Sequence, residues 1–451
     1  MSAVDYPKLA KSLVARAKKS GAQQAEVFLQ VGRESSVRVR DGEIEDLTQA
    51  TSKGVGIRVF AKNRLGFAFT SDFNPKSLES FVDRAVELAK AAAPNALNGL
   101  PEKNELKKRP KLEGLFDNEV AELAPDWKIQ RALEIEKAGK SHDPRIKTFE
   151  SVGAGDYVSE VHIASSEGLL DSYSGTYVYL YAVPVAQDSN GQLQTSYWVD
   201  YKRFLKDLDS AEAVGKEAAR RAVRMLGARK VKTQRVPVIF DQQMAASFVG
   251  NIASAANGDS IFKKSSIFAP LLGKKVAAEN VSIVDDGLLP RGIASSPFDG
   301  EGVPTRKTSI IEKGVLRSFL YDAFTARKAK TKSTGNASRG YSSLPHIGIN
   351  NLYMEPGSTP PDEMIRGVKN GFYVTAMLGS GANPVTGDYS RGANGMWIEN
   401  GELAFPVQEV TVAGNLLKML EGVDAIGSDL EFRGSVAAPT IRFAELTVSG
   451  E

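Results

Sequence analysis

Histidine and cysteine are the residues that most often build a hydrolytic metal site, and this chain has few of them. It contains three histidines, His142, His162 and His346, and no cysteine. A metal-binding helix of the His-Glu-x-x-His type needs two histidines on one face and a glutamate as base, and no pair of histidines here has that spacing. Thiolate metal sites, thiol nucleophiles and disulfides are excluded as well. We therefore expect each histidine to be structural.

Motifs for other kinds of chemistry are incomplete. No Gly-x-Ser-x-Gly sequence marks the nucleophile elbow of an α/β-hydrolase. Gly215-Lys216 and Gly273-Lys274 are not followed by Ser or Thr, so no phosphate-binding P-loop is present. Gly153-x-Gly155 and Gly379-x-Gly381 lack the third glycine of a dinucleotide-binding turn. Serine-hydrolase and nucleotide-dependent chemistry are thus left without support.

Carboxylates are the remaining candidates for acid–base chemistry. Asp388 and Glu399 lie in one glycine-rich segment, and Asp285 and Asp286 precede a glycine. A pair of carboxylates can act as general acid and base or hold a hard cation. Adjacent aspartates before glycine usually form a turn, so we predict a turn at Asp285-Asp286. A hydrolase that uses Asp388 and Glu399 stays open as an alternative.

Two basic clusters raise the question of nucleic-acid binding. They lie within residues 103–111 and 216–235. Arginines at helical spacing usually form a solvated face, and no DNA- or RNA-binding motif accompanies them. Lys and Arg total 57 against 54 Asp and Glu, which leaves a net charge of only +3. We therefore predict no nucleic-acid partner.

A glycine-rich segment from Gly379 to Asn415 is the most distinctive stretch of the chain. Met396–Ile398 are predicted to begin a strand, Asn400-Gly401 to turn it, and Val407–Val412 to return. The loop before that hairpin, next to exposed strand backbone, could bind an extended peptide by strand addition. The alternative is a tightly folded structural crossover, because glycine lets backbones approach closely.

Length and composition indicate what kind of scaffold positions these residues. The chain has 451 residues, of which 42% are hydrophobic and 25% charged, as in a globular protein of about two or three domains. No apolar run approaches the ~18 residues that span a bilayer, and Met1–Lys19 lacks a signal-peptide pattern. We expect a cytoplasmic protein with no membrane partner.

The predicted fold class is α+β, with an N-terminal half of mixed helix and antiparallel sheet followed by a C-terminal domain dominated by antiparallel sheet. Local signals define the first half: Asp5 can cap a helix, Asp41-Gly42 marks a hairpin, and Asn74-Pro75 begins a second helix. From residue 236 onward the chain has the pattern of short strands with many Gly and Pro turns, apart from a helix near Gln242–Ala255.

These patterns divide the chain into four segments. They are an N-terminal α+β unit (residues 1–95), a linker with several prolines and lysines (96–125), a central strand-rich unit closed by a helix (126–230) and a C-terminal β-rich domain (231–451). The central unit includes a strand that carries Tyr177, Tyr179 and Tyr181 on one face.

The glycine-rich segment also resembles part of a known protein family. GSGANPVTGDYSRGANGMWIENGE, followed by FPVQEVTVAGNLLKML, is similar to the signature of the TldD/PmbA metallopeptidases, which are also labelled modulators of DNA gyrase. Supporting matches lie at residues 54–59, 284–288, 298–302, 314–316 and 438–441. The resemblance therefore covers essentially the whole chain.

The resemblance implies two kinds of subunit. The TldD-like kind holds zinc with a helical His-Glu-x-x-x-His motif and a C-terminal cysteine, whereas PmbA-like (TldE-like) subunits lack these ligands. Aligned through Asn257–Asp259, the two histidine positions fall on Val249 and Ser254 and the glutamate position falls on Gly250. We therefore expect no catalytic residue and no metal site in this chain, and we expect zinc in its partner subunit.

The function implied by the resemblance is that of a PmbA-like, non-catalytic subunit of a heteromeric zinc metallopeptidase acting on small or unfolded polypeptides. The expected partner is a TldD-like catalytic subunit in a heterodimer, and the isolated chain could form a homodimer. Candidate contacts to peptide or partner are polar residues of the glycine-rich segment: Asn383, Thr386, Asp388, Ser390 and Arg391. The alternatives are a stand-alone peptidase or hydrolase that uses carboxylates and a homodimeric peptide-binding or scaffold protein.

Overall fold

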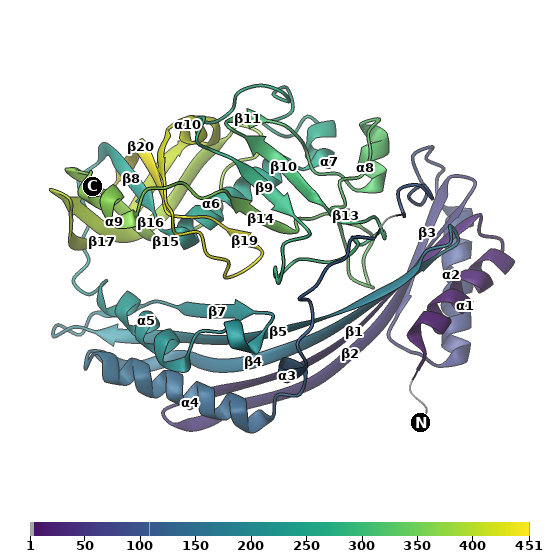
Figure 1. Ribbon diagram of the computed structural model, residues 1–451, viewed down its shortest axis with the longest axis horizontal. Helices are drawn as coiled ribbons and strands as arrows, with labels where there is room; N and C mark the ends of the chain where they lie inside the picture. Colours follow the sequence, from purple (N-terminus) through teal and green to yellow (C-terminus); the bar gives the residue numbers. More distant parts are fainter. Residues whose placement is uncertain (1–3, 108, 451) are drawn as a thin grey trace.

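The computed structural model describes residues 4–107 and 109–450. A long curved sheet forms the N-terminal part, with helices on its outer face, and a C-terminal unit stands over its inner face (Figure 1). None of the described helices is long and apolar enough to cross a lipid bilayer. The predicted class, α+β with a sheet-dominated C-terminal part, is confirmed.

The N-terminal sheet has the strand order β3-β2-β1-β4-β5-β6, and β7 also pairs with β5. The predicted hairpin joins β1 and β2, which pair in antiparallel fashion. Its two turn residues, Asp41 and Gly42, have positive φ angles of 51° and 83°, as a two-residue turn between twisted strands requires. The elements of this part are α1 (Tyr6–Lys19), β1 (Gln24–Arg40), β2 (Glu43–Ala61), β3 (Arg64–Thr70), α2 (Pro75–Ala91), α3 (Asn118–Ala121), α4 (Pro125–His142), β4 (Ile146–Ser165), β5 (Leu170–Gln187), β6 (Leu193–Thr195), β7 (Trp198–Lys202), η1 (Leu205–Asp207) and α5 (Ala211–Val223).

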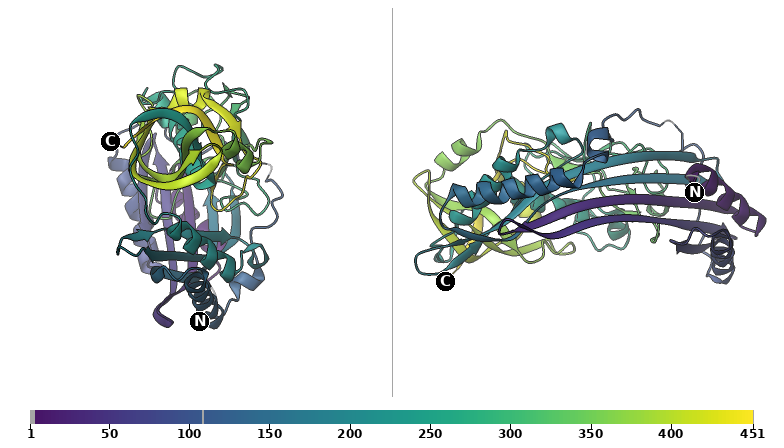
Figure 2. Two further views of the ribbon diagram at one scale, coloured as in Figure 1. Left: turned by 90° about the vertical axis from the view of Figure 1, so that its left-hand side faces the viewer. Right: turned by 90° about the horizontal axis from the view of Figure 1, so that it is seen from below.

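Helices cover the outer face of this sheet at both of its ends (Figure 2). At one end α1 and α2 pack on Val27, Leu29 and Ile57, and at the other end α4 and α5 pack on Val37 and Val152. Val27, Leu29 and Val37 lie in a stretch of β1 with an unbroken register, so these odd-numbered residues share one face. The even-numbered residues of β1 therefore point to the inner face.

The segment between α2 and α3 runs along the sheet. Leu115 accepts a hydrogen bond from the N–H of Thr176 at 3.1 Å, and Arg109 forms an ion pair with Asp171 at 2.8 Å. Both partners belong to β5, so these contacts hold the connection beside that strand on its way to α3.

The C-terminal unit combines a closed barrel, a second sheet and short helices. In the barrel, β17-β16-β15-β8-β20 are neighbours in that order and β17 also pairs with β20, which closes the ring (Figure 2). The second sheet has the order β11-β10-β9-β14-β19. The elements are β8 (Gln234–Phe240), α6 (Gln242–Ala255), α7 (Gly258–Phe262), β9 (Ile283–Asp286), β10 (Lys307–Glu312), β11 (Val315–Leu316), α8 (Ala323–Lys328), β12 (Ala337–Ser338), β13 (His346–Ile347), β14 (Asn351–Met354), α9 (Pro361–Arg366), β15 (Asn370–Leu378), β16 (Asp388–Glu399), β17 (Glu402–Asn415), α10 (Leu416–Glu421), β18 (Val423–Ile426), β19 (Val436–Ala437) and β20 (Ile441–Ser449).

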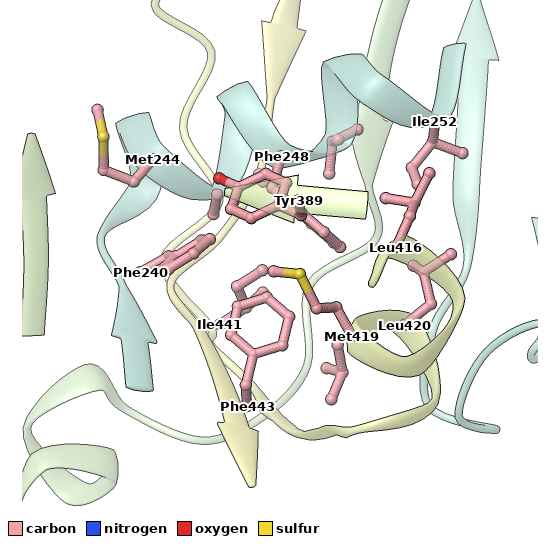
Figure 3. Packing of buried hydrophobic residues seen from close by; sticks show 14 of the residues in the cluster. Phe240, Met244, Phe248, Ile252, Tyr389, Leu416, Met419, Leu420, Ile441 and Phe443 are labelled. Atoms are coloured by element: carbon pink, nitrogen blue, oxygen red, sulfur yellow. The ribbon is translucent and has the colours of Figure 1, made fainter. Parts of the chain in front are cut away.

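Helix α6 packs against both the barrel and the second sheet, and its apolar face belongs to the core cluster that joins them. The ring of Phe248 meets Phe443 of β20 edge to face, with centroids 5.3 Å apart. The ring of Phe240 on β8 also meets the Phe443 ring, with centroids 4.8 Å apart. Met244 and Ile252 of α6 belong to the same cluster (Figure 3). This packing fixes both the position of α6 and the direction in which its other face points.

Two sequence predictions in this unit are wrong. Met396–Ile398 lie at the end of a strand rather than at its beginning, because β16 already starts at Asp388. Its glycines suit a strand here, since a Cβ on Gly395 would overlap the carbonyl oxygen of Tyr373 on β15. Asp285-Asp286 is not a turn but the end of β9. Asp285 is fully buried there and accepts hydrogen bonds from Asn336 and Asn350, which the Asp-Asp-Gly pattern does not reveal.

Candidate functional site

The helix that carries the zinc-motif positions is firmly anchored. The carboxylate of Asp241 caps the N-terminus of α6 and accepts the N–H of Met244 at 3.0 Å. Burial raises the pKa of Asp241, while the guanidinium of Arg221 and the N–H of Met244 oppose that shift. The helix has the bounds predicted from the sequence. Its rotation about its own axis is set by the buried side chains that pack in the core described above.

The three motif-equivalent positions differ in burial, and none carries an imidazole, thiol or carboxylate. Val249 is fully buried in the core, whereas Ser254 is exposed and its hydroxyl lies 3.5 Å from the carbonyl oxygen of Gly250. Positions 249 and 254 are five residues apart, which places them about 140° apart around a regular helix. Within residues 4–107 and 109–450, no group of three or more His, Cys, Asp or Glu could hold a metal ion.

The exposed side of the helix carries small, uncharged residues, which we call the α6 stripe: Ser247, Gly250, Asn251 and Ser254. Their spacing of three and four residues places them on one face of the helix. The glycine-rich segment folds against this stripe. The side-chain oxygen of Asn251 accepts the N–H of Ala382 at 2.8 Å, and the guanidinium of Arg391 donates to the hydroxyl of Ser247 at 2.7 Å. The structure therefore brings Arg391 to the helix that carries Gly250 and Ser254.

The other polar candidates hold a turn together. The side-chain oxygen of Asn383 accepts the N–H groups of Val385 at 2.9 Å and Thr386 at 3.3 Å. The hydroxyl of Thr386 donates to the carboxylate of Asp388 at 2.7 Å. Ser390 is exposed on β16 and follows the buried Tyr389 along the strand, so it lies outside this turn. Asn383, Thr386 and Asp388 thus stabilise the turn and remain exposed at its surface.

The carboxylates Asp388 and Glu399 do not meet. They are the first and last residues of β16, opposite Asn415 and Glu402 of β17 respectively. At about 3.3 Å per residue, a strand of this length separates them by roughly 35 Å. One peptide bond cannot reach both groups, so the arrangement gives no support to a hydrolase built on this pair.

Sequence reasoning missed a buried charged cluster where the C-terminal unit meets the sheet. We call Glu26, Arg58, Glu301 and Arg339 the junction cluster. Arg58 donates to Glu26 at 3.0 Å and to Glu301 at 2.9 Å, and Arg339 donates to Glu26 at 2.5 Å. Less than a tenth of each side chain is exposed. One feature of the sequence could have indicated this cluster: Glu26 and Arg58 are each a charged residue within an apolar stretch of a strand.

The turn that presents Glu301 also buries Asp299. The carboxylate of Asp299 accepts the N–H groups of Glu301 and Val303 at 2.9 Å and that of Ala337 at 3.0 Å. Burial raises the pKa of Asp299 to about 8, and the neighbouring Glu301 carboxylate adds to the rise, against those three N–H groups. The turn is thus a buried structural joint.

Most of the chain matches one family of proteins. Models of the PmbA/TldA metallopeptidase match it at residues 25–89 (domain 1), 118–226 (central domain) and 233–450 (C-terminal domain). The chain belongs to this family. The predicted resemblance is confirmed, and the family and its named relatives are peptidases.

Full-length relatives and solved structures agree with this membership. Metalloprotease PmbA of Escherichia coli O157:H7 is 33% identical over 95% of this chain and 92% of its own length. The PmbA homolog of Haemophilus influenzae is 33% identical over 96% and 94%. The crystal structure of a protein described as a putative modulator of DNA gyrase from Bacteroides thetaiotaomicron covers 100% of both chains with a TM-score of 0.92 and 28% identity. TldE from Thermococcus kodakarensis shares the fold, with a TM-score of 0.88 and 24% identity over 98% of this chain and 99% of its own.

Proposed function

We propose that this chain is a PmbA-like subunit without a zinc site of its own, which supports a TldD-like, zinc-binding catalytic subunit. The complex would hydrolyse small or unfolded polypeptides. The observation that carries the proposal is the content of α6, where Val249, Gly250 and Ser254 stand at the positions of two zinc ligands and a base.

The chemistry of zinc hydrolysis explains why these residues matter. A catalytic zinc needs several nitrogen, sulfur or carboxylate ligands and a bound water, and a nearby base takes the proton of that water. Val249 has no lone pair and is buried, Gly250 has no side chain, and Ser254 offers one neutral hydroxyl. The zinc and the base are therefore assigned to the partner subunit.

The surface next to the α6 stripe is suited to contact with a partner or a peptide. Val385, at the turn of the glycine-rich segment, and Leu378, at the end of β15, are each more than half exposed. Asp388 and Ser390 present polar groups on the same segment. Exposed apolar side chains rimmed by polar ones are typical of interaction sites, so this edge is the proposed place of contact.

The test is reconstitution from purified subunits. This chain and a TldD-like subunit from the same genome are assayed alone and mixed, for zinc content and for cleavage of an unfolded polypeptide. We expect zinc in the TldD-like subunit and the highest cleavage rate in the mixture. Stoichiometric zinc in this chain alone, or cleavage by it alone, would contradict the proposal.

A matched pair of variants makes the reconstitution sharper. Leu378→Ser changes an exposed apolar side chain at the end of β15, whereas Leu193→Ser changes a similarly exposed leucine on β6 of the other part. We expect only Leu378→Ser to weaken stimulation of the partner. Equal stimulation by both variants would place the contact elsewhere, and loss of stimulation by both would indicate an effect on solubility.

A further inference from the structure

Five tyrosines lie on the inner face of the N-terminal sheet. Tyr173 of β5 packs against Phe298 of the C-terminal unit, with ring centroids 5.1 Å apart, so the odd-numbered residues of β5 face inward. We call the five the tyrosine platform: Tyr157 of β4, Tyr177, Tyr179 and Tyr181 of β5, and Tyr201 of β7. Tyr157 lies directly opposite Tyr177, and Tyr179 lies opposite Tyr201, so the five form one patch across three strands.

Glycines on neighbouring strands let these rings lie flat on the sheet. A Cβ built on Gly32 of β1 would overlap the hydroxyl of Tyr157. Likewise, a Cβ on Gly155 of β4 would overlap the ring of Tyr179, and one on Gly153 would overlap the ring of Tyr181. The rings of Tyr157, Tyr179 and Tyr181 therefore reach over the backbone of the next strand.

The rings are arranged side by side with nearly parallel planes. Tyr177 and Tyr201 have centroids 5.5 Å apart and planes inclined by 23°. Tyr179 and Tyr201 are 6.0 Å apart and inclined by 22°, and Tyr157 and Tyr177 are 6.2 Å apart and inclined by 30°. All five side chains are half-buried, so solvent reaches part of each. The C-terminal unit stands over this end of the sheet (Figure 1).

A cation already occupies one ring face of the tyrosine platform. The guanidinium carbon of Arg203 lies 4.7 Å from the centre of the Tyr177 ring. The same guanidinium donates to the carbonyl oxygens of Gly292 at 2.7 Å and Ser295 at 2.9 Å, so it is fixed in place. Aromatic faces attract cations through their quadrupole, and this contact shows the preference within the chain itself.

The charge beside the other rings is negative. Glu34 of β1 lies directly opposite Tyr157, on the same face, and is exposed. Burial raises the pKa of Tyr179, and the Glu34 carboxylate adds to that rise, so its field reaches the platform. Two arginines further along β1 already face carboxylates, because Arg38 and Arg40 both pair with Glu45.

We propose that the tyrosine platform is a docking surface for an extended polypeptide that carries lysine or arginine side chains. The cationic groups would lie on the upper ring faces beside Glu34. This inference rests on the proposed function and names the substrate class it favours. Bases of single-stranded nucleic acid also stack on aromatic rings, but their phosphates would face the Glu34 carboxylate.

Binding by the full-length chain alone tests the proposal. The probes are three fluorescein-labelled oligomers of roughly twelve units, a length sufficient to cross several strands: a Gly/Ser peptide with interspersed arginines, the same peptide with glutamates, and oligothymidylate. We expect anisotropy to rise only with the arginine peptide. Glu34→Gln, which changes an exposed residue, should weaken that binding about fivefold. Equal binding of the two peptides, or preferred binding of oligothymidylate, would overturn the proposal.

A second variant removes the flat geometry but keeps every tyrosine. Gly155→Ala places a methyl group under the Tyr179 ring and must lift it. Gly434→Ala is the matched control, because a Cβ there meets no atom within 4 Å. We expect Gly155→Ala to weaken binding of the arginine peptide about three- to tenfold and Gly434→Ala to leave it unchanged. Unchanged binding by Gly155→Ala with an unaltered circular dichroism spectrum would overturn the assignment to the platform.

Failure of this inference is distinguishable from failure of the proposed function. The anisotropy assay needs no partner subunit and no zinc. Intact stimulation of a TldD-like subunit together with no arginine-peptide binding would overturn the platform alone. Arginine-peptide binding without any effect on a TldD-like subunit would overturn the subunit role and leave the platform standing.

Discussion

The junction cluster and the α6 stripe have opposite chemistry. The junction cluster places two carboxylates and two guanidinium groups in a nearly solvent-free joint between the sheet and the C-terminal unit. The α6 stripe, on the helix where a hydrolytic relative would carry its ligands, presents hydroxyls, an amide and a glycine. In this chain, buried charge is concentrated where two units are held in register, and the residues of the α6 stripe carry none.

This difference separates two uses of charged residues. A buried ion pair costs much desolvation free energy and stabilises little, but removing one partner leaves a buried charge without compensation. Such a cluster therefore fixes one arrangement of the two units and penalises others. The α6 stripe has no such constraint, since its hydrogen bonds to Ala382 and Arg391 involve neutral partners on the helix.

Removing Arg58 should have the largest effect. Arg58→Met leaves Glu26 and Glu301 buried with less compensation, and we expect the free energy of unfolding to fall by about 3–5 kcal/mol. The measurement is urea unfolding followed by tryptophan fluorescence. Arg84→Met is the control, because its pair with Glu87 at 3.6 Å is two-thirds exposed and should contribute at most about 0.5 kcal/mol. Similar losses in both variants would contradict the special role of the junction cluster.

Restoring the motif residues should come next in size. In the variant Val249→His, Gly250→Glu, Ser254→His, the first histidine enters the core that Val249 fills. We expect a loss of about 2–3 kcal/mol in stability and no stoichiometric zinc after dialysis, because the chain contains no cysteine to complete the ligand set. Thermal unfolding and metal analysis are the measurements. Ser254→His alone should leave stability unchanged, and tight zinc binding by the triple variant would show that α6 can hold the metal without a cysteine ligand.

Loosening the glycine-rich segment should have a smaller effect. Arg391→Ala removes the hydrogen bond to Ser247, and we expect a loss of about 1 kcal/mol. Hydrogen–deuterium exchange should become faster in residues 379–387, with the junction unaffected. Ser390→Ala, at an exposed neighbour on β16, is the control. Unchanged exchange in Arg391→Ala would mean that the Asn383–Asp388 turn holds the segment by itself.

The pH dependence of the N-terminal sheet should give the smallest effect. Burial lowers the pKa of His162 below its usual 6.5, against the opposing Glu160 carboxylate. As pH falls below that value, the unfolded chain binds a proton that the folded chain resists, so stability decreases. The difference in melting temperature between about pH 7.5 and about pH 5 should therefore be smaller in His162→Gln than in the unaltered chain. An identical difference would remove His162 from this account.

Local signals were enough to predict much of the secondary structure. The Asp5 and Asn74 caps, the Asp41-Gly42 turn and the bounds of α6 all depend on residues close in sequence. The family also follows from a contiguous motif. These features need no knowledge of which distant strands pair, and that is why the sequence alone predicts them.

Long-range pairing and burial were not predictable in the same way. The position of Val37 opposite Ala154 joins the two N-terminal units into one sheet, and no local pattern specifies it. The glycine-rich start of β16 has the composition of a loop until the close approach of β15 is known. Equally, Val249 is buried and Ser254 is exposed because of the way α6 is rotated against the core, and the spacing of the motif does not specify that rotation.

The ring of strands in the C-terminal unit has a consequence for how the chain folds during synthesis. The first strand of the barrel, β8, lies between β15 and β20, with Phe240 opposite Ile441. Pairing over such a long stretch of sequence carries a large loop-closure entropy and slows folding. While the ribosome makes the intervening residues, β8 has no partner and its open edges can pair with other chains. The barrel therefore completes only after β20 has emerged. A truncated chain that ends before Ile441 would leave one edge of β8 unpaired, which would make it a target for chaperones and proteases.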